Sequence, residues 1–194
     1  METEKIVALY FSHIPDEVWE KASKIKLLIT DVDGVLTDGG IIYDNMEVEY
    51  KKYDVKDGLI VNHLRRNKFM VGAITGRNSR VVENRCEELK FDFHYHGVKN
   101  KGKKLEEVLE TLELEADQVA YIGDDLIDIP ILSKVGLAIC PADAVEYVKP
   151  FAHYVSRFPG GKGVFREIGD LLLHASQLLV PIIENLSQKE NDKN

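Results

Sequence analysis

Two pairs of aspartates are the residues of this sequence best suited to carry out chemistry. Asp31 and Asp33 are separated by one residue, and Asp124 and Asp125 form a second pair further along the chain. In an extended strand, residues two apart point to the same side, so Asp31 and Asp33 would repel each other without a cation. Turn and helix-cap aspartates need no cation, but two such pairs after apolar runs favour a site for a hard divalent cation.

The charge distribution agrees with a small anionic ligand. The chain has 25 Lys and Arg against 33 Asp and Glu, a net charge of −8, which argues against general nucleic-acid binding. Residues 51–104 nevertheless hold 14 basic and only 6 acidic residues. This basic segment suits an anionic small molecule, although solvated helix faces would give the same composition.

Several other chemistries are excluded by spacing. An EF-hand starting at Asp31 would have Val35 and Leu36 where an oxygen ligand and a glycine are required. The two Gly-Lys pairs are not followed by Ser or Thr, so neither forms a P-loop. Cys86 and Cys140 lie too far apart in the sequence to indicate a zinc finger or a disulfide framework.

Short apolar runs alternate with segments of helical periodicity along the chain. A hairpin is expected at 41–53, with its turn at Asp44-Asn45. The alternation predicts an α/β fold, a Rossmann-like parallel sheet with helices on both faces and the small β-hairpin as an insertion. Strands are expected at 25–30, 69–75, 91–95, 118–122, 136–140 and 153–156, and helices at 56–67, 79–89, 101–114, 126–134 and 163–186, the last interrupted by Pro181.

The placement of the polar residues fits this fold. Ligands of open parallel sheets bind beyond the carboxyl ends of the strands. Asp31, Thr75 and Asp124 each come at the end of an expected strand, so we expect their side chains to meet at one edge.

The 194 residues predict one main domain with two extensions. The main domain spans 25–175, an N-terminal extension spans 1–24, and a C-terminal helical extension with a polar tail spans 176–194. No apolar run reaches the roughly 18–20 residues of a membrane span. The first residues lack the basic region and apolar core of a secretory signal, so we expect a cytoplasmic protein without a membrane partner.

Four short motifs occur in order along the chain: DVDGVLTDG (31–39), AITGR (73–77), Lys101 and GDDLID (123–128). Taken together, they resemble the motifs of the haloacid dehalogenase superfamily. Further stretches include YDVKDG (53–58), TGRNSRVVENRC (75–86), GVKNK (97–101) and GGKGVFRE (160–167). These resemble the 3-deoxy-D-manno-octulosonate 8-phosphate (KDO-8-phosphate) phosphatases of that superfamily. The resemblance covers Ile25 to Leu173 and implies a haloacid dehalogenase-like fold and a phosphoric monoester hydrolase of lipopolysaccharide biosynthesis.

The resemblance also implies catalytic roles. Asp31 is the expected nucleophile, which forms an aspartyl-phosphate, and Asp33 is the expected general acid and base. Mg²⁺ is expected to bind Asp31, the backbone carbonyl of Asp33, and Asp124. Thr75 and Lys101 would bind the phosphoryl group and balance its charge. Asp125 and Asp128 follow Asp124 in the same motif, and we expect them to start a helix or to support the site.

The expected substrate is KDO-8-phosphate, hydrolysed to the free sugar acid and phosphate, and a sialic-acid-type nine-carbon 9-phosphate is the alternative. The resemblance implies that Arg77 and Arg85 bind the sugar acid, and a planar guanidinium suits bidentate binding of its carboxylate. Without the motif, both would be taken as helix-surface residues. The full set of substrate-binding residues implied by the resemblance is Asp33, Asp54, Val55, Lys56, Asp57, Gly58, Arg77, Arg85 and Lys101.

The motif spacing leaves no room for a cap domain. Asp33 and Thr75 are 42 positions apart, and Thr75 and Lys101 are 26 apart. An open site excludes water poorly unless another chain covers it. The resemblance implies a homotetramer in which hairpins of neighbouring subunits cover the sites, whereas a hairpin that packs only on its own sheet is the alternative.

Overall fold

The structure, a computed structural model, describes residues 2–191 of the chain. Six strands form one sheet in the order β5-β4-β1-β6-β7-β8, and all neighbouring strands are parallel. This arrangement confirms the predicted α/β fold with a Rossmann-like parallel sheet. The strands are β1 (Leu27–Thr30), β4 (Met70–Ile74), β5 (Phe93–Tyr95), β6 (Val119–Ile122), β7 (Leu137–Cys140) and β8 (Tyr154–Val155).

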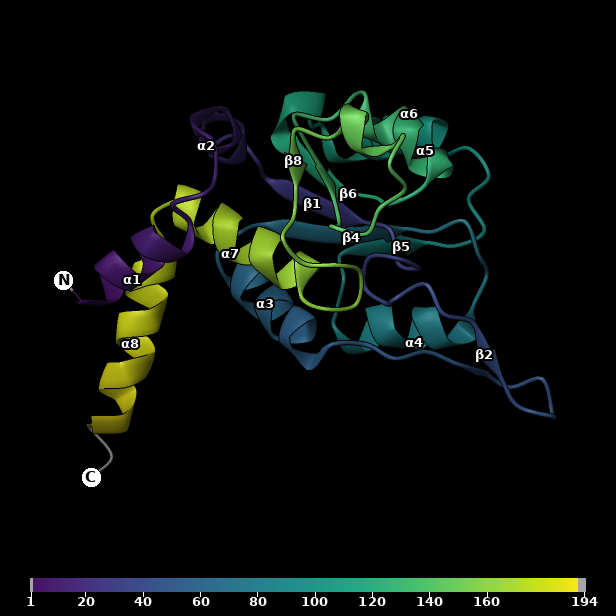
Figure 1. Ribbon diagram of the computed structural model, residues 1–194, viewed down its shortest axis with the longest axis horizontal. Helices are drawn as coiled ribbons and strands as arrows, with labels where there is room; N and C mark the ends of the chain where they lie inside the picture. The colour runs from purple at the N-terminus through teal and green to yellow at the C-terminus, as the bar shows by residue number, and fades with distance from the viewer. Residues whose placement is uncertain (1, 192–194) are drawn as a thin grey trace.

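Helices cover both faces of the sheet (Figure 1). One face packs against α3 (Val55–Arg66), α4 (Arg80–Glu88) and α7 (Val164–Ala175). The other face packs against α5 (Lys101–Leu112) and α6 (Ile129–Leu132). Both faces are therefore buried, which explains why the strands read as continuous apolar runs.

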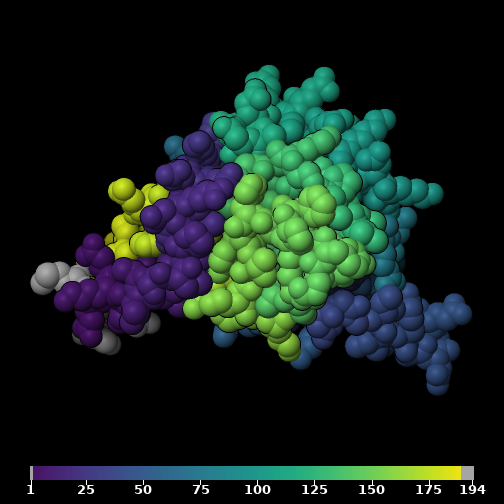
Figure 2. Space-filling view, turned by 45° about the horizontal axis from the view of Figure 1, so that its top comes forward, coloured from purple at the N-terminus to yellow at the C-terminus, as the bar shows by residue number. Residues whose placement is uncertain are grey.

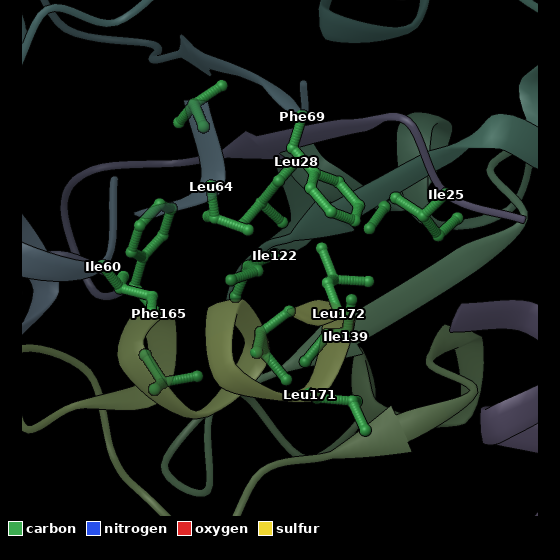
Figure 3. Close-up of a cluster of buried hydrophobic side chains, with 14 of the residues drawn as sticks. Ile25, Leu28, Ile60, Leu64, Phe69, Ile122, Ile139, Phe165, Leu171 and Leu172 are labelled. Carbon is green, nitrogen blue, oxygen red and sulfur yellow. The ribbon is translucent and has the colours of Figure 1, made fainter. Parts of the chain in front are cut away.

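Alternation of side chains along each strand builds the two cores. In β1, Leu28 belongs to the cluster on the α7 side, whereas Leu27 and Ile29 belong to the cluster on the α5 side. Figure 3 shows the α7-side cluster, where Leu28 and its neighbours on the sheet face Leu172 and Phe165 of α7. Each fully buried aliphatic side chain contributes about 1.5–3 kcal/mol, so this double core fixes the strand ends that carry the site.

A small hairpin leaves the body after β1 (Figures 1 and 2). It consists of β2 (Ile42–Tyr43) and β3 (Glu49–Tyr50), and Asp44 accepts hydrogen bonds from the backbone N–H groups of Met46 and Val48 in its turn. Among the described residues, only this hairpin and α3 lie between β1 and β4, and only α4 lies between β4 and β5. The predicted hairpin and the expected lack of a cap domain are therefore confirmed.

The terminal helices lie at the opposite end of the molecule from the hairpin (Figure 1). The chain begins with α1 (Glu2–Tyr10) and α2 (Asp16–Ala22) and ends with α8 (Leu179–Asn191), which packs on α1 and α7. The predicted helix break at Pro181 is wrong. The break lies between α7 and α8, where Gln177 has a φ of 60°, and Pro181 sits in the first turn of α8, where its missing N–H is not needed.

The remaining elements are short. The helix predicted at 126–134 is a 3₁₀ turn (Leu126–Asp128) followed by α6, and two further 3₁₀ turns lie at Ala116–Gln118 and Lys149–Phe151. Within residues 2–191, none of the helices combines the length and the apolar composition that crossing a membrane requires.

Candidate active site

The carboxyl ends of three adjacent strands bring the predicted motifs together. Thr30 at the end of β1 pairs with Ile122 of β6 on one side and Ala73 of β4 on the other. The residues that follow these strands therefore share one edge of the sheet and surround a cavity of about 420 Å³. The cavity is lined by Asp31, Asp33, Thr75, Gly76, Arg77, Val98, Lys99, Asp124, Asp125 and Ile127.

The start of α5 places Lys101 next to Asp31, below the residues that line this cavity. Asn100 caps the helix, since its side chain accepts a hydrogen bond of 3.0 Å from the N–H of Lys103. The Lys101 side chain is only 1% exposed, and its Nζ lies 3.0 Å from Asp31 Oδ1 and 2.6 Å from Asp128 Oδ1. Burial alone would lower the pKa of Lys101, but these two carboxylates raise it above its ordinary value, so the ammonium stays charged beside Asp31.

Asp128 organises the surrounding groups. Its Oδ1 accepts hydrogen bonds from Lys101 and from the Tyr121 hydroxyl, at 2.6 and 2.5 Å. Its Oδ2 accepts from the backbone N–H groups of Asp124 and Asp125, at 3.0 and 3.2 Å. The Asp128 side chain, which was expected to start a helix or to support the site, thus holds both the lysine and the loop that carries Asp124.

The negative charges of Asp31 and Asp124, at the centre of the site, are poorly balanced by nearby positive charge. Burial raises the pKa of Asp31 to about 7, with the charge of Lys101 opposing this rise and that of Asp128 adding to it. Burial also raises the pKa of Asp124 to about 8, and repulsion from Asp31 and Asp128 adds to the effect. The pair would hold its charge at neutral pH far more readily with a cation between the two groups.

The donor set fits a hard divalent cation. Asp31, Asp124 and Asp128 each offer a carboxylate oxygen within 4.8 Å of the others. In the described part of the chain, Asp31 Oδ1 and Asp124 Oδ1 are buried without a hydrogen-bond donor, although the first lies near the Lys101 ammonium. Both oxygens of Asp128 already accept hydrogen bonds. Asp124 therefore has a free oxygen for a metal, and Asp31 offers one that faces only the Lys101 ammonium.

Glycines allow the loop after β1 to approach these groups. Gly34 has a φ of +86°, and a Cβ at this position would lie 2.1 Å from Asp124 Oδ2. A Cβ on Gly160 would lie 2.1 Å from the carbonyl oxygen of Gly34, and the N–H of Gly161 donates to the Val35 carbonyl at 2.9 Å. The segment that carries the GGKG motif thus packs directly on the loop that carries Asp31 and Asp33.

Asp33 has a partner that the sequence did not reveal. Its Oδ1 pairs with the ammonium of Lys51, which also lies 3.4 Å from Glu49 Oε1. Glu49 and Lys51 are two residues apart at the end of the hairpin and point to the same side, while Tyr50 between them is exposed. This period-two alternation of inward charges is the signal that could have identified them.

Arg77 lines the same cavity as Asp31. Its Nη2 donates to Glu49 Oε1 and to the hydroxyl of Tyr43, each at 3.0 Å. Its Nη1 is buried and has no hydrogen-bond acceptor among the described residues. The guanidinium is thus held by the hairpin with one nitrogen left for an anionic ligand.

The other predicted arginine lies elsewhere. Arg85 and Val55 line a second cavity of about 370 Å³, and Lys51 is also among its lining residues. Gly58 lies under Arg85, since a Cβ there would be 2.8 Å from the guanidinium. Lys51 is the residue that connects this second cavity with Asp33.

The remaining residues of the predicted substrate loop serve helix ends within the chain. Asp54 caps α3 by accepting a hydrogen bond of 2.8 Å from the N–H of Lys56, whose side chain is exposed. Asp57 is buried and accepts a hydrogen bond of 2.8 Å from the N–H of Arg166 in the first turn of α7. A single chain therefore does not bring these three residues to the cavity that holds Asp31.

Comparisons with known proteins agree with this geometry. A family model described as haloacid dehalogenase-like hydrolase matches residues 94–168. A 3-deoxy-D-manno-octulosonate 8-phosphate phosphatase of Yersinia pestis is 42% identical over 169 residues, which cover 87% of this chain and 90% of that protein. The crystal structure of a Yersinia pestis protein of the same name superposes with a TM-score of 0.83 at 43% identity, covering 84% of this chain and 89% of that one.

A further solved relative was determined with a metal ion and small molecules bound. It is a 3-deoxy-D-manno-octulosonate 8-phosphate phosphatase of Moraxella catarrhalis in complex with a magnesium ion, a phosphate ion and a KDO molecule. It superposes with a TM-score of 0.87 at 34% identity and covers 90% of this chain and 99% of that one.

Proposed function

Because the chain belongs to the 3-deoxy-D-manno-octulosonate 8-phosphate phosphatase family of haloacid dehalogenase-like hydrolases, we propose that it hydrolyses KDO-8-phosphate to KDO and phosphate. Membership makes it a phosphoric monoester hydrolase, as the motif resemblance implied. The observation that carries the proposal is a cavity lined both by Asp31, which is paired with the buried Lys101, and by Arg77, whose Nη1 is free. A phosphate ester that also carries a carboxylate matches these two groups.

The proposed reaction assigns a role to each of these side chains. An oxygen of Asp31 attacks phosphorus, the bond from phosphorus to the sugar oxygen breaks, and Asp33 gives its proton to that oxygen. Asp33 then takes a proton from a water molecule that attacks the same phosphorus, and the bond to Asp31 breaks. Lys101 balances the charge on the phosphoryl oxygens, and Thr75 at the end of β4 lines the cavity for a hydrogen bond to them.

We assign Mg²⁺ as the cofactor, held by Asp31, the backbone carbonyl of Asp33, and Asp124. The free oxygens and raised pKa values of the two side chains support this assignment, as does the magnesium ion in the Moraxella catarrhalis relative. When bound, the ion supplies positive charge that offsets repulsion between an anionic nucleophile and an anionic phosphate.

The proposed substrate is the phosphate ester of an eight-carbon sugar acid. Its hydrolysis supplies the free sugar acid for lipopolysaccharide biosynthesis. The KDO molecule in the Moraxella catarrhalis relative and the placement of Arg77 support it. The free Nη1 of Arg77 is available to donate to the carboxylate of a sugar acid, a group that a sugar phosphate without an acid function lacks.

We also propose that the enzyme is a homotetramer whose hairpins cover neighbouring sites. The cavity is open in the single chain, and the hairpin exposes Ile42, Met46 and Val48 to solvent, with Met46 84% exposed. Apolar side chains on a projecting element are typical of a protein–protein contact. Assembly would also let Asp54, Lys56 and Arg85 of the predicted substrate-binding set reach a ligand.

The experiment that tests the proposed function compares KDO-8-phosphate with a sialic-acid-type 9-phosphate, each with Mg²⁺ and with excess chelator. We expect a higher kcat/KM for the eight-carbon ester and loss of turnover in chelator. Asp31→Asn is expected to abolish turnover while the far-ultraviolet circular dichroism spectrum stays unchanged. A higher kcat/KM for the nine-carbon ester, or full activity of Asp31→Asn, would contradict the proposal.

A further inference from the structure

An ion pair at the base of the hairpin connects the hairpin with the expected general acid. The side chain of Lys51 is fully buried, and its ammonium pairs with Asp33 Oδ1. The Asp33 side chain is 20% exposed at the cavity that also holds Asp31. A lysine stem carries four rotatable bonds, so its complete burial here means that the surrounding structure holds the ammonium in one place.

The two oxygens of Asp33 are in different situations. Oδ1 is held by Lys51, whereas Oδ2 is buried and has no hydrogen-bond partner in the described part of the chain. A residue that gives and then takes a proton needs one oxygen free to meet the substrate and a second contact that fixes its orientation. The observed arrangement supplies both features.

Glu49 holds Lys51 in turn. Its Oε1 lies 3.4 Å from the Lys51 ammonium and 3.0 Å from the guanidinium of Arg77. Its other oxygen accepts a hydrogen bond from the Ser79 hydroxyl. Burial opposes ionisation of Glu49, but Ser79, Lys51 and Arg77 lower its pKa below the ordinary value, so it is charged between the two cations.

Ser79 binds Glu49 instead of capping the helix that it precedes. Ser79 stands at the N-cap position of α4, yet its side chain makes no capping hydrogen bond and donates to Glu49 instead. A serine cap normally stabilises a helix start, so its use on the hairpin indicates that the position of Glu49 matters to the protein.

We propose that Lys51 is a positioning residue, which holds the Asp33 carboxylate in the orientation that transfers a proton to the leaving sugar oxygen. Glu49 fixes Lys51 and Arg77 together, so the hairpin places the proton-transferring group and the carboxylate-binding group as one unit. This inference rests on the proposed phosphatase function and adds to it a residue outside the four superfamily motifs.

The test uses two substrates that differ in how much they need a proton. In a sugar phosphate the leaving group is a sugar alkoxide, which is a poor leaving group and needs a proton from an acid. In p-nitrophenyl phosphate the leaving group is p-nitrophenolate, which leaves readily and needs little proton transfer. For Lys51→Met we expect kcat/KM for KDO-8-phosphate to fall about 10²-fold or more. The fall in kcat/KM for p-nitrophenyl phosphate should be smaller by a factor of at least about ten. Lys51→Arg, which keeps the charge, is expected to recover part of the loss.

The matched control is Lys52→Met. Lys52 is exposed, so this substitution removes the same charge from the neighbouring position and leaves the Lys51–Asp33 pair in place. We expect this variant to keep wild-type kcat/KM for both esters. Equal losses on both esters in Lys51→Met, or no loss on either, would overturn the inference. If Lys51→Met does not fold, Lys51→Gln, whose shorter polar side chain cannot reach Asp33 in the same way, provides the same comparison.

Crystal structures separate this inference from the proposed function. If the wild type hydrolysed neither ester, the proposed function would fail, and the orientation of Asp33 in wild-type and Lys51→Met crystals would still decide the role of Lys51. We expect the Asp33 carboxylate to turn in Lys51→Met and to stay in place in Lys52→Met. An unchanged Asp33 in both would overturn the inference.

Discussion

The carboxylate of Asp57 shows how a single residue can connect two helices. It lies in α3 and accepts a hydrogen bond from the N–H of Arg166, in the first turn of α7. Gly163, at the N-cap of α7, has no side chain to satisfy that turn, so Asp57 caps α7 from a neighbouring helix. Burial raises the pKa of Asp57 to about 7, although the N–H of Arg166 opposes the rise.

This raised pKa gives a pH dependence with a defined sign. Between pH 4 and 7 the folded state holds a proton on Asp57 that the unfolded state releases, so stability from this group is lost as pH rises through about 7. Asp57→Asn keeps the acceptor oxygen and cannot ionise. We expect the variant to gain stability relative to wild type by up to a few kcal/mol from pH 5 to pH 8, since one pKa unit corresponds to about 1.4 kcal/mol.

Urea unfolding at the two pH values measures this difference. The acids at the active site titrate equally in both proteins, so their contributions cancel in the comparison. A stability difference between variant and wild type that is the same at pH 5 and pH 8 would show that Asp57 ionises in the folded protein as it does in the unfolded chain.

Gly34 allows a second test at a single residue. A methyl group there would collide with the Asp124 carboxylate and would also occupy a left-handed backbone position. We expect Gly34→Ala to weaken Mg²⁺ activation of hydrolysis at least tenfold and to lower stability by about 1–2 kcal/mol. The measurements are kcat/KM as a function of Mg²⁺ concentration and urea unfolding.

Gly163→Ala is the control for backbone strain. Gly163 has a φ of +103°, and nothing lies within 4 Å of a Cβ built there. This variant should therefore lose similar stability and keep its Mg²⁺ dependence. If both variants shifted the Mg²⁺ dependence alike, the close approach of Gly34 to Asp124 would have no role in metal binding.

Among the elements, α8 adds stability away from the site. Leu179 is buried in the α7-side core, and Val180 and Ile182 are partly buried against it. None of the cavity-lining residues around Asp31 comes from α8. We expect deletion of residues 179–194 to lower the melting temperature and to leave kcat/KM unchanged, because lost burial of a few apolar side chains costs roughly 1.5–3 kcal/mol each.

Leu179→Ala is the matched point variant, and it should lower the melting temperature less than the deletion does. The assay is made at a temperature where circular dichroism shows both variants folded. A tenfold fall in kcat/KM for the deletion under these conditions would place α8 in the function of the enzyme.

Local patterns predicted most of the elements because their signals are strong. The apolar runs of β1, β4 and β6 are buried on both faces, and Asp54 and Asn100 cap the helices that follow them in the chain. Pro181 was misleading because a proline is tolerated in a first helical turn as well as after a last one. The sequence alone does not distinguish these two positions.

The site was predictable where its residues follow strands, and not where they come from elsewhere. Asp31, Thr75 and Asp124 meet because adjacent parallel strands end together. Tyr121 and Lys51 reach the site from a strand interior and from the hairpin, and only the folded geometry shows which groups they meet. The alternation around Lys51 could indicate that its side chain points inward, but it does not identify Asp33 as the partner.

For the whole molecule, the exposed hairpin predicts self-association. Met46 and Val48 lie at its tip and are 84% and 48% exposed. We expect wild-type protein to elute as a tetramer in size-exclusion chromatography with light scattering, and the double variant Met46→Glu/Val48→Glu to elute as a smaller species. Charges buried between hairpins repel each other and lose solvation, so assembly should weaken and kcat/KM should fall with it.

Leu9→Glu is the control, since Leu9 is 75% exposed on α1 at the other end of the molecule. It should leave assembly and activity unchanged. A wild-type protein that is monomeric and fully active would contradict the proposal that neighbouring hairpins cover the sites.

In the proposed mechanism, a divalent ion joins two strand ends so that an oxygen of Asp31 can attack phosphorus. A crystal structure with Mg²⁺ and beryllium fluoride, a mimic of the phosphoryl group, would reveal this arrangement. We expect beryllium bonded to a carboxylate oxygen of Asp31, the Lys101 ammonium on its fluorides, and one Mg²⁺ shared by Asp31 and Asp124. Side chains of Asp31 and Asp124 turned away from each other with no ion between them would contradict it.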